Sequence, residues 1–109
     1  MNLLLDTHIL IWWAVNSPAM PPKCKDLLAD PQHQVFFSSL SIWEVAIKHG
    51  KGLIPIPSET LRTESIRAGL LELPFSAKHA SRIETLPSIH ADPFDRGLIS
   101  QALDVPLLL

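Results

Sequence analysis

Short apolar runs that alternate with helix-like segments constrain the fold of this 109-residue chain more than any other feature. The run Leu3-Leu4-Leu5 is apolar throughout, as expected of a strand buried on both faces of a sheet. The expected strands cover residues 3–5, 34–38, 71–73 and 105–109. The expected helices cover residues 9–15, 21–30, 41–50, 58–68 and 76–86, with a last one that begins at Asp92.

This alternation predicts an α/β domain with three layers, in which a central, mostly parallel sheet is flanked by helices. Parallel strands need crossover connections, and the intervening helices supply them. The last strand is expected to lie beside the first, because right-handed crossovers from a central first strand bring their carboxyl ends to one edge. No linker divides the sequence, so residues 1–109 are expected to form a single domain.

Composition excludes several classes of protein. The net charge of −2 provides no general attraction to nucleic acid or to a membrane surface, so any contact with nucleic acid must come from a local patch. The single cysteine, Cys24, excludes an internal disulfide and fits a reducing compartment. The N-terminal apolar run is interrupted by Asp6 and His8 and resembles neither a signal peptide nor a membrane span. We therefore expect a cytoplasmic protein without membrane association.

Three carboxylates occupy positions that an α/β fold brings to one place. Asp6 follows the first strand, Glu44 lies shortly after the second, and Asp95 lies in the first turn of the last helix. In an open α/β sheet, the carboxyl ends of strands and the N-termini of the following helices meet at one edge, where ligands bind. We therefore expect the three side chains to converge at this edge.

Helix capping explains each acid when it is taken alone. Ser41 and Glu44 have the spacing of a capping box, and so do Asp92 and Asp95. Acids in a first turn are also favoured by the helix dipole, by roughly 0.3–1 kcal/mol. Asp6 is likewise an N-cap candidate, and Ser58 is expected to cap the helix over residues 58–68.

Taken together, the acids favour a metal site. Asp95 begins the apolar face of residues 98, 99 and 102, so its side chain is expected to point towards the sheet. An inward-facing carboxylate is costly unless a cation or strong donors meet it. Oxygen ligands suit Mg²⁺ or Mn²⁺ rather than zinc. The histidines contain no close-spaced pair of the zinc-ligand type; they are His8, His33, His49, His79 and His90.

Three motifs together resemble the PIN-domain proteins of the VapC toxin type. They are "LLLDTHILIWW", "SSLSIWEVAIKHGKG" and "HADPFDRGLISQAL", and they span nearly the whole chain in the family's order. The resemblance implies a PIN-like α/β domain acting as an Mg²⁺- or Mn²⁺-dependent endoribonuclease that cleaves RNA phosphodiester bonds. It also implies a cognate antitoxin protein that blocks the acidic site, and a homodimer.

The resemblance also assigns site residues. Asp6, Glu44 and Asp95 match the family's catalytic and metal-binding acids, with Asp6 and Asp95 as direct ligands and Glu44 as a ligand or a group that orients water. Carboxylate-held metals can supply a nucleophilic water, neutralise charge at phosphorus and assist the leaving oxygen. Asp92, Thr7 and Ser39 are candidates for additional site residues.

A local basic patch lies on the helix that carries Glu44. Lys48, His49 and Lys51 form it, and Lys48 and Lys51 are candidates for contacts with RNA phosphates. A solvated helix end explains the patch equally well, since positive charge near a helix C-terminus complements the dipole. The three tryptophans are assigned to packing, either in the core or against an antitoxin or a second subunit. They are Trp12, Trp13 and Trp43.

The sequence departs from the family at its C-terminal end. Family members continue beyond the last strand into a Thr-x-Asp segment with a fourth acid, whereas this sequence ends at Leu109. We therefore expect the domain to lack its C-terminal end, as a fragment or a shortened protein. The alternative to an active ribonuclease is a catalytically weak or inactive PIN-fold protein that still binds an antitoxin. A receiver-like or phosphatase-like module with Asp6 as nucleophile lacks the accompanying basic signature.

Overall fold

The computed structural model of the chain describes residues 1–87, 92–105 and 107–108. Its strands are β1 (Asn2–Leu4), β2 (Gln34–Ser38), β3 (Leu71–Leu73) and β4 (Leu107–Leu108). Its helices are α1 (Thr7–Ala14), α2 (Pro22–Ala29), α3 (Ser39–Gly50), α4 (Ser58–Arg67), α5 (Ala77–Arg82), the 3₁₀ helix η1 (Ile83–Thr85) and α6 (Pro93–Ala102). None of the helices in these ranges is long and apolar enough to cross a membrane.

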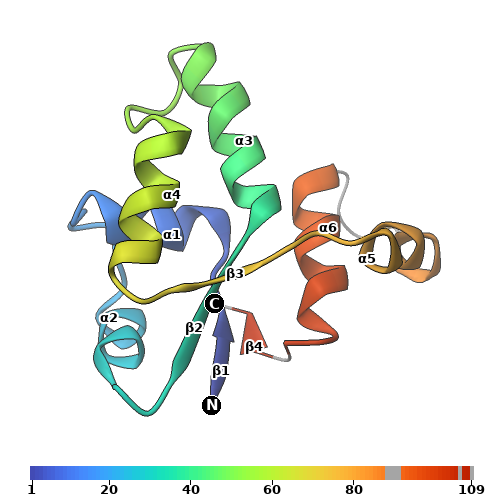
Figure 1. Cartoon of the computed structure of the whole chain (residues 1–109), viewed down its shortest axis with the longest axis horizontal. Coiled ribbons are helices and arrows are strands. Elements are labelled where there is room, and N and C mark those ends of the chain that lie inside the picture. The colour runs from blue at the N-terminus through green and yellow to red at the C-terminus, as the bar shows by residue number, and fades with distance from the viewer. Residues whose placement is uncertain (88–91, 106, 109) are drawn as a thin grey trace.

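The strands form one parallel sheet in the order β3-β2-β1-β4. Leu3 of β1 lies opposite Val35 of β2 on one side and Leu107 of β4 on the other. Figure 1 shows α1, α2 and α4 on one side of the strands and α5 and α6 on the other, while α3 extends from the carboxyl end of β2. The predicted three-layer α/β fold is thus confirmed, and so is the pairing of the last strand with the first.

Local capping chemistry sets most of the helix starts. Asp6 caps α1 by accepting the backbone N–H of His8, and Asp92 caps α6 with Pro93 as the first helical residue. Two expected caps were wrong. Helix α4 begins directly after Pro57, whose carbonyl accepts the N–H of Leu61, and no side chain caps it.

The second incorrect cap is at the start of α3, which was expected at Ser41. Ser38 is its N-cap, because its hydroxyl accepts the N–H of Leu40, so α3 begins two residues earlier than expected. Ser41 therefore lies inside the helix and does not form a capping box with Glu44. The helix starts directly at the end of β2 without a loop, and this places Glu44 in its second turn, close to the edge of the sheet.

Other boundaries differ by a few residues. Strand β1 ends at Leu4 rather than at residue 5, and the helix expected over residues 76–86 divides into α5 and η1. Strand β4 is shorter than the range 105–109; Pro106 and Leu109 lie outside the described residues, as does His90. The end of α5 passes into a 3₁₀ turn, which is common at the C-termini of helices.

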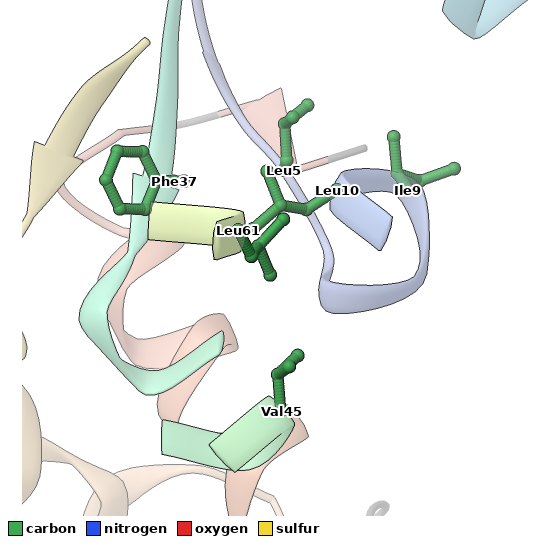
Figure 2. Close-up of a cluster of buried hydrophobic side chains, with 6 residues drawn as sticks. All are labelled: Leu5, Ile9, Leu10, Phe37, Val45 and Leu61. Atoms are coloured by element: carbon green, nitrogen blue, oxygen red, sulfur yellow. The ribbon is translucent and has the colours of Figure 1, made fainter. Parts of the chain in front are cut away.

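The main hydrophobic core lies between the sheet and the helices α1, α3 and α4. Figure 2 shows its buried side chains, which are Leu5, Ile9, Leu10, Phe37, Val45 and Leu61. Burying a side chain of this kind contributes roughly 1.5–3 kcal/mol. This core fixes the start of α1 and the middle of α3 against the end of the sheet, so it also positions Asp6 and Glu44.

Candidate active site

The start of α1 and the first turns of α3 meet at the carboxyl edge of the sheet. Strands β1 and β2 are parallel neighbours, and each is followed at once by its helix. The buried hydroxyls of Thr7 and Ser41 are 2.9 Å apart and hydrogen-bonded, which joins α1 directly to α3. Thr7 and the helix that carries Glu44 are therefore neighbours, as the α/β pattern predicted.

Asp6 combines a capping role with partial exposure. Its Oδ1 accepts the backbone N–H of His8 at 2.7 Å, and Nδ1 of the His8 ring lies 3.6 Å from the same oxygen. The Asp6 side chain is 34% exposed. A carboxylate has about four acceptor positions on two oxygens, so one capping bond leaves capacity for a second role.

Glu44 is a buried acid with a cationic partner. It is only 4% exposed, and its Oε2 accepts a hydrogen bond from Nζ of Lys48, one turn later on α3. A buried carboxylate needs such a partner because desolvation otherwise penalises its charge. The hydrogen bond to Glu44 raises the pKa of Lys48, and the negative charges of Glu44, Asp92 and Asp95 raise it further against a lowering by burial.

The start of α6 brings two more acids to the same region. Asp92 accepts the N–H groups of Phe94 and Asp95 at 2.8 and 3.4 Å, and Asp95 is half-buried in the first turn. The ring of Phe94 packs edge-on against that of Trp43 on α3, with 5.2 Å between centroids. Figure 1 shows α6 running beside α3. The charges of Asp92 and Asp95 act on Lys48, so both acids lie near the Glu44–Lys48 pair.

A family model for the PIN domain matches residues 3–105 of the chain. The chain belongs to the PIN domain family. This confirms the family that the three sequence motifs indicated.

Solved structures show the same fold. VapBC2 from Rickettsia felis, bound to a DNA fragment from its promoter, has a TM-score of 0.69 and 20% identity, over 99% of this chain and 85% of that chain. VapC20 from Mycobacterium tuberculosis, a Sarcin-Ricin loop cleaving toxin, has a TM-score of 0.64 and 12% identity, over 96% of this chain and 84% of that one. No curated protein sequence gives a significant match.

The acids of this PIN domain suit a hard cation in type but do not form a closed ligand set. Within residues 1–87, 92–105 and 107–108, no three acidic, histidine or cysteine side chains are placed to hold one ion together. The ammonium of Lys48 lies beside Glu44, where a cation would otherwise compensate the buried charge. A metal held by Glu44 would therefore compete with Lys48 for the same carboxylate.

Two further candidates from the sequence occupy other surroundings. The Ser39 hydroxyl accepts the N–H of Phe75 at 2.9 Å, so it ties α3 to the segment after β3. Lys51 is the exposed C-cap of α3, at the end of the helix remote from the sheet.

Sequence reasoning missed a buried polar link behind the site. The Ser38 hydroxyl donates to Oε1 of Gln101 on α6, and Nε2 of Gln101 donates to the carbonyl of Leu73. A glutamine in an amphipathic helix gives no signal of such a role, because nothing local distinguishes it from a surface residue.

Proposed function

We propose that this PIN domain is a metal-dependent endoribonuclease toxin of a toxin–antitoxin pair, acting on RNA in the cytoplasm. The observation that supports the proposal is the burial of Glu44 at the carboxyl edge of the sheet, beside a lysine on which the charges of Asp92 and Asp95 also act. A buried acid with two further acids near its lysine partner is costly to the fold, which is typical of a site kept for its chemistry. Helix capping accounts for Asp6 and Asp92 but not for Glu44, whose side chain caps nothing.

The proposed roles follow from the chemistry of each side chain and from the family resemblance, since the described acids do not form a preassembled ligand set. Asp6, Glu44 and Asp95 would hold Mg²⁺ or Mn²⁺, and Asp92 and Thr7 would complete the polar lining. The bound metal would supply a nucleophilic water at neutral pH and neutralise charge at the phosphorus. Lys48 is protonated at neutral pH, and its raised pKa reinforces this, so its ammonium can hold a phosphate beside these acids.

Conservative amide substitutions separate catalysis from capping. Asparagine caps a helix about as well as aspartate, so Asp6→Asn should preserve α1 while removing a charged ligand. We expect the protein to cleave single-stranded RNA in the presence of Mg²⁺ or Mn²⁺ and not in EDTA. Asp6→Asn should lower the cleavage rate by at least about 100-fold, which is the size of a typical general-acid–base contribution. The matched control is Asp26→Asn, an exposed acid on α2. Equal cleavage by Asp6→Asn and Asp26→Asn would refute the proposed site.

A second candidate function is antitoxin binding without catalysis. A cavity away from the candidate active site supports it. A cavity of about 560 Å³ lies between α1, α2 and α4, with apolar walls formed by Trp12, Trp13, Met20 and Leu28. Such a hollow suits apolar side chains of a protein partner. Ala29 lies exposed at its edge, so Ala29→Arg should block binding of the cognate antitoxin, whereas Ala80→Arg on the exposed part of α5 should not.

A homodimer is proposed on the exposed apolar surface of α3. Trp43 is 59% exposed and Ile47, one turn later, is 37% exposed. Large apolar side chains that lie together on a surface mark an interaction site. If two copies associate here, Ile47→Lys should convert a dimer into a monomer in sedimentation velocity, and an unchanged mass would exclude this face as the interface.

A further inference from the structure

A second cavity opens directly beside the Glu44–Lys48 pair. Its volume is about 400 Å³, and it lies between the start of α1 and the segment of residues 51–57. Thr7, Glu44 and Lys48 form its polar end. The remaining lining residues are His8, Ile11, Leu53, Ile54 and Pro55. The cavity therefore combines charged groups of the candidate active site with a lining that includes several apolar side chains.

The outer wall of the cavity is held in place by the end of α3. The N–H of Leu53 donates to the carbonyl of Lys48 at 2.9 Å, and Gly52 adopts a φ of +74°, which lets the chain turn back. The ring Nδ1 of His49 donates to the carbonyl of Ile54 at 2.7 Å. Hydrogen bonds between the end of α3 and the consecutive residues Leu53 and Ile54 thus fix the wall before any ligand binds.

The apolar walls are open to solvent. Leu53 is 69% exposed, although it extends over the cavity. Ile11 and Ile54 are half-buried on the other walls. A flat ligand that enters would cover these side chains, and its removal from water would favour binding. His8, whose ring is 69% exposed, stands at the mouth and offers a donor and an acceptor to the edge of such a ligand.

We propose that this cavity binds one unpaired nucleobase of an RNA whose phosphate contacts Lys48. The inference rests on the proposed ribonuclease function and adds a base-binding subsite to it. A nucleotide combines a phosphate with a flat ring one sugar away, and the cavity combines the ammonium of Lys48 with an apolar lining. A base within a duplex is stacked on both faces and paired at its edge, so only an unpaired base can enter the cavity.

The test measures binding rather than cleavage. The protein is labelled at the methyl groups of Ile and Leu and titrated in EDTA with the four nucleoside 5′-monophosphates. Ribose 5-phosphate is the matched probe, because it carries the same phosphate and sugar without a base. We expect the nucleotides to shift the methyl signals of Ile11, Leu53 and Ile54, while ribose 5-phosphate leaves them unchanged. The exposed methyl groups of Ile66 and Leu103, which lie outside the cavity, should not respond.

A pair of matched variants gives the second measurement. Leu53→Ala removes an exposed apolar wall of the cavity, so it should weaken nucleotide binding by about fivefold, the effect of leaving about 40 Å² of apolar surface in water. Leu103→Ala removes a similarly exposed leucine after α6 and should leave binding unchanged. Equal effects of the two variants, or equal methyl shifts from ribose 5-phosphate, would overturn the proposal.

Two further outcomes also count against it. Nucleotide-induced shifts confined to the hollow near Trp13 would place the ligand elsewhere. Shifts of the Leu53 signal that follow protein concentration alone would show that a second copy covers the cavity. Because the titration contains no metal, base binding can fail while metal-dependent RNA cleavage stands, and cleavage can fail while base binding stands.

Discussion

Ser38, at the end of β2, donates its hydroxyl to Oε1 of Gln101, which lies 63 residues later on α6. The same hydroxyl accepts the N–H of Leu40 and so caps α3, while Nε2 of Gln101 donates to the carbonyl of Leu73 at the end of β3. Both Ser38 and Gln101 are fully buried. This pair therefore aligns the helix that carries Asp95 with the helix that carries Glu44.

Replacing Gln101 with leucine should destabilise the protein. Gln101→Leu introduces an apolar side chain of similar size and leaves the Ser38 hydroxyl and the Leu73 carbonyl without their buried partner. The expected loss in the free energy of unfolding is about 1–3 kcal/mol, measured by urea denaturation. Gln32→Leu, at an exposed position in a turn, should stay within about 0.5 kcal/mol of wild type. Equal stability of the two variants would show that the Ser38–Gln101 bond contributes nothing.

Gly97 allows α6 to approach the start of α3 closely. A Cβ atom at this position would lie 2.3 Å from Cδ1 of Leu40 and 3.3 Å from Cε1 of Phe75. Gly97→Ala gains about 1 kcal/mol of helix propensity but overpacks a buried contact at a cost of about 1–3 kcal/mol, so we expect a net loss of stability. Gly50→Ala is the control, because nothing lies within 4 Å of its Cβ, and it should raise the melting temperature. Stabilisation by both substitutions would contradict the close packing of α6.

The sequence predicted those features that depend on local chemistry. The bounds of β2 and the caps Asp6 and Asp92 were correct, because an apolar strand pattern and a capping carboxylate act on their immediate neighbours. The cap of α3 was misassigned to Ser41, because Ser38, Ser39 and Ser41 offer equivalent local signals. The choice among them is made by tertiary contacts.

The structure also explains why the site itself was only partly predictable. Convergence of separate chain segments at one sheet edge follows from the fold class, and the Thr7–Ser41 bond shows it. The pairing of Glu44 with Lys48 has an i, i+4 signal in the sequence, yet the burial of Glu44 depends on the helices around it. The role of Gln101 has no local signal, because both of its partners are distant in the sequence.

Lys48 acts as the internal counter-ion of Glu44, and a metal should compensate for its loss. In EDTA, Lys48→Met leaves a buried carboxylate unpaired, so we expect a loss of about 1–3 kcal/mol. This is less than the 3–5 kcal/mol of a fully buried pair, because the Lys48 side chain is 35% exposed. Mg²⁺ that binds Glu44 stabilises the native state by mass action, so the variant should gain more in melting temperature from Mg²⁺ than wild type does.

The matching double variant tests this explanation. Lys48→Met with Glu44→Gln removes both charges, so it should regain stability in EDTA and lose the extra response to Mg²⁺. A Mg²⁺-induced shift in melting temperature that is the same in all three proteins would exclude Glu44 as a metal-responsive carboxylate.

Asp104 joins α5 to the end of α6 and makes the stability of this contact depend on pH. Arg82 donates to both of its oxygens, and Nε2 of His79 donates to Oδ2 at 2.9 Å. The hydrogen bond from Arg82, followed by that from His79, lowers the pKa of Asp104 from 3.8 to about 2. A lowered carboxyl pKa means that the stabilisation is fully present above the unfolded-state value and is lost as the pH falls through the folded-state value.

Asp104→Asn should therefore be less stable than wild type at pH 6, and the difference should shrink as the pH falls from about 4 to about 2. The measurement is the difference in melting temperature between the two proteins across this range, so titrations that both proteins share cancel. Asp26→Asn, an exposed acid on α2, provides the comparison and should show no such convergence. Because Arg82 also donates to the carbonyl of Ser100 and to its hydroxyl, the contact between α5 and α6 does not depend on Asp104 alone. The variant should remain folded at pH 6, and a difference that stays constant down to pH 2 would show that the charge of Asp104 does not stabilise the helix pair.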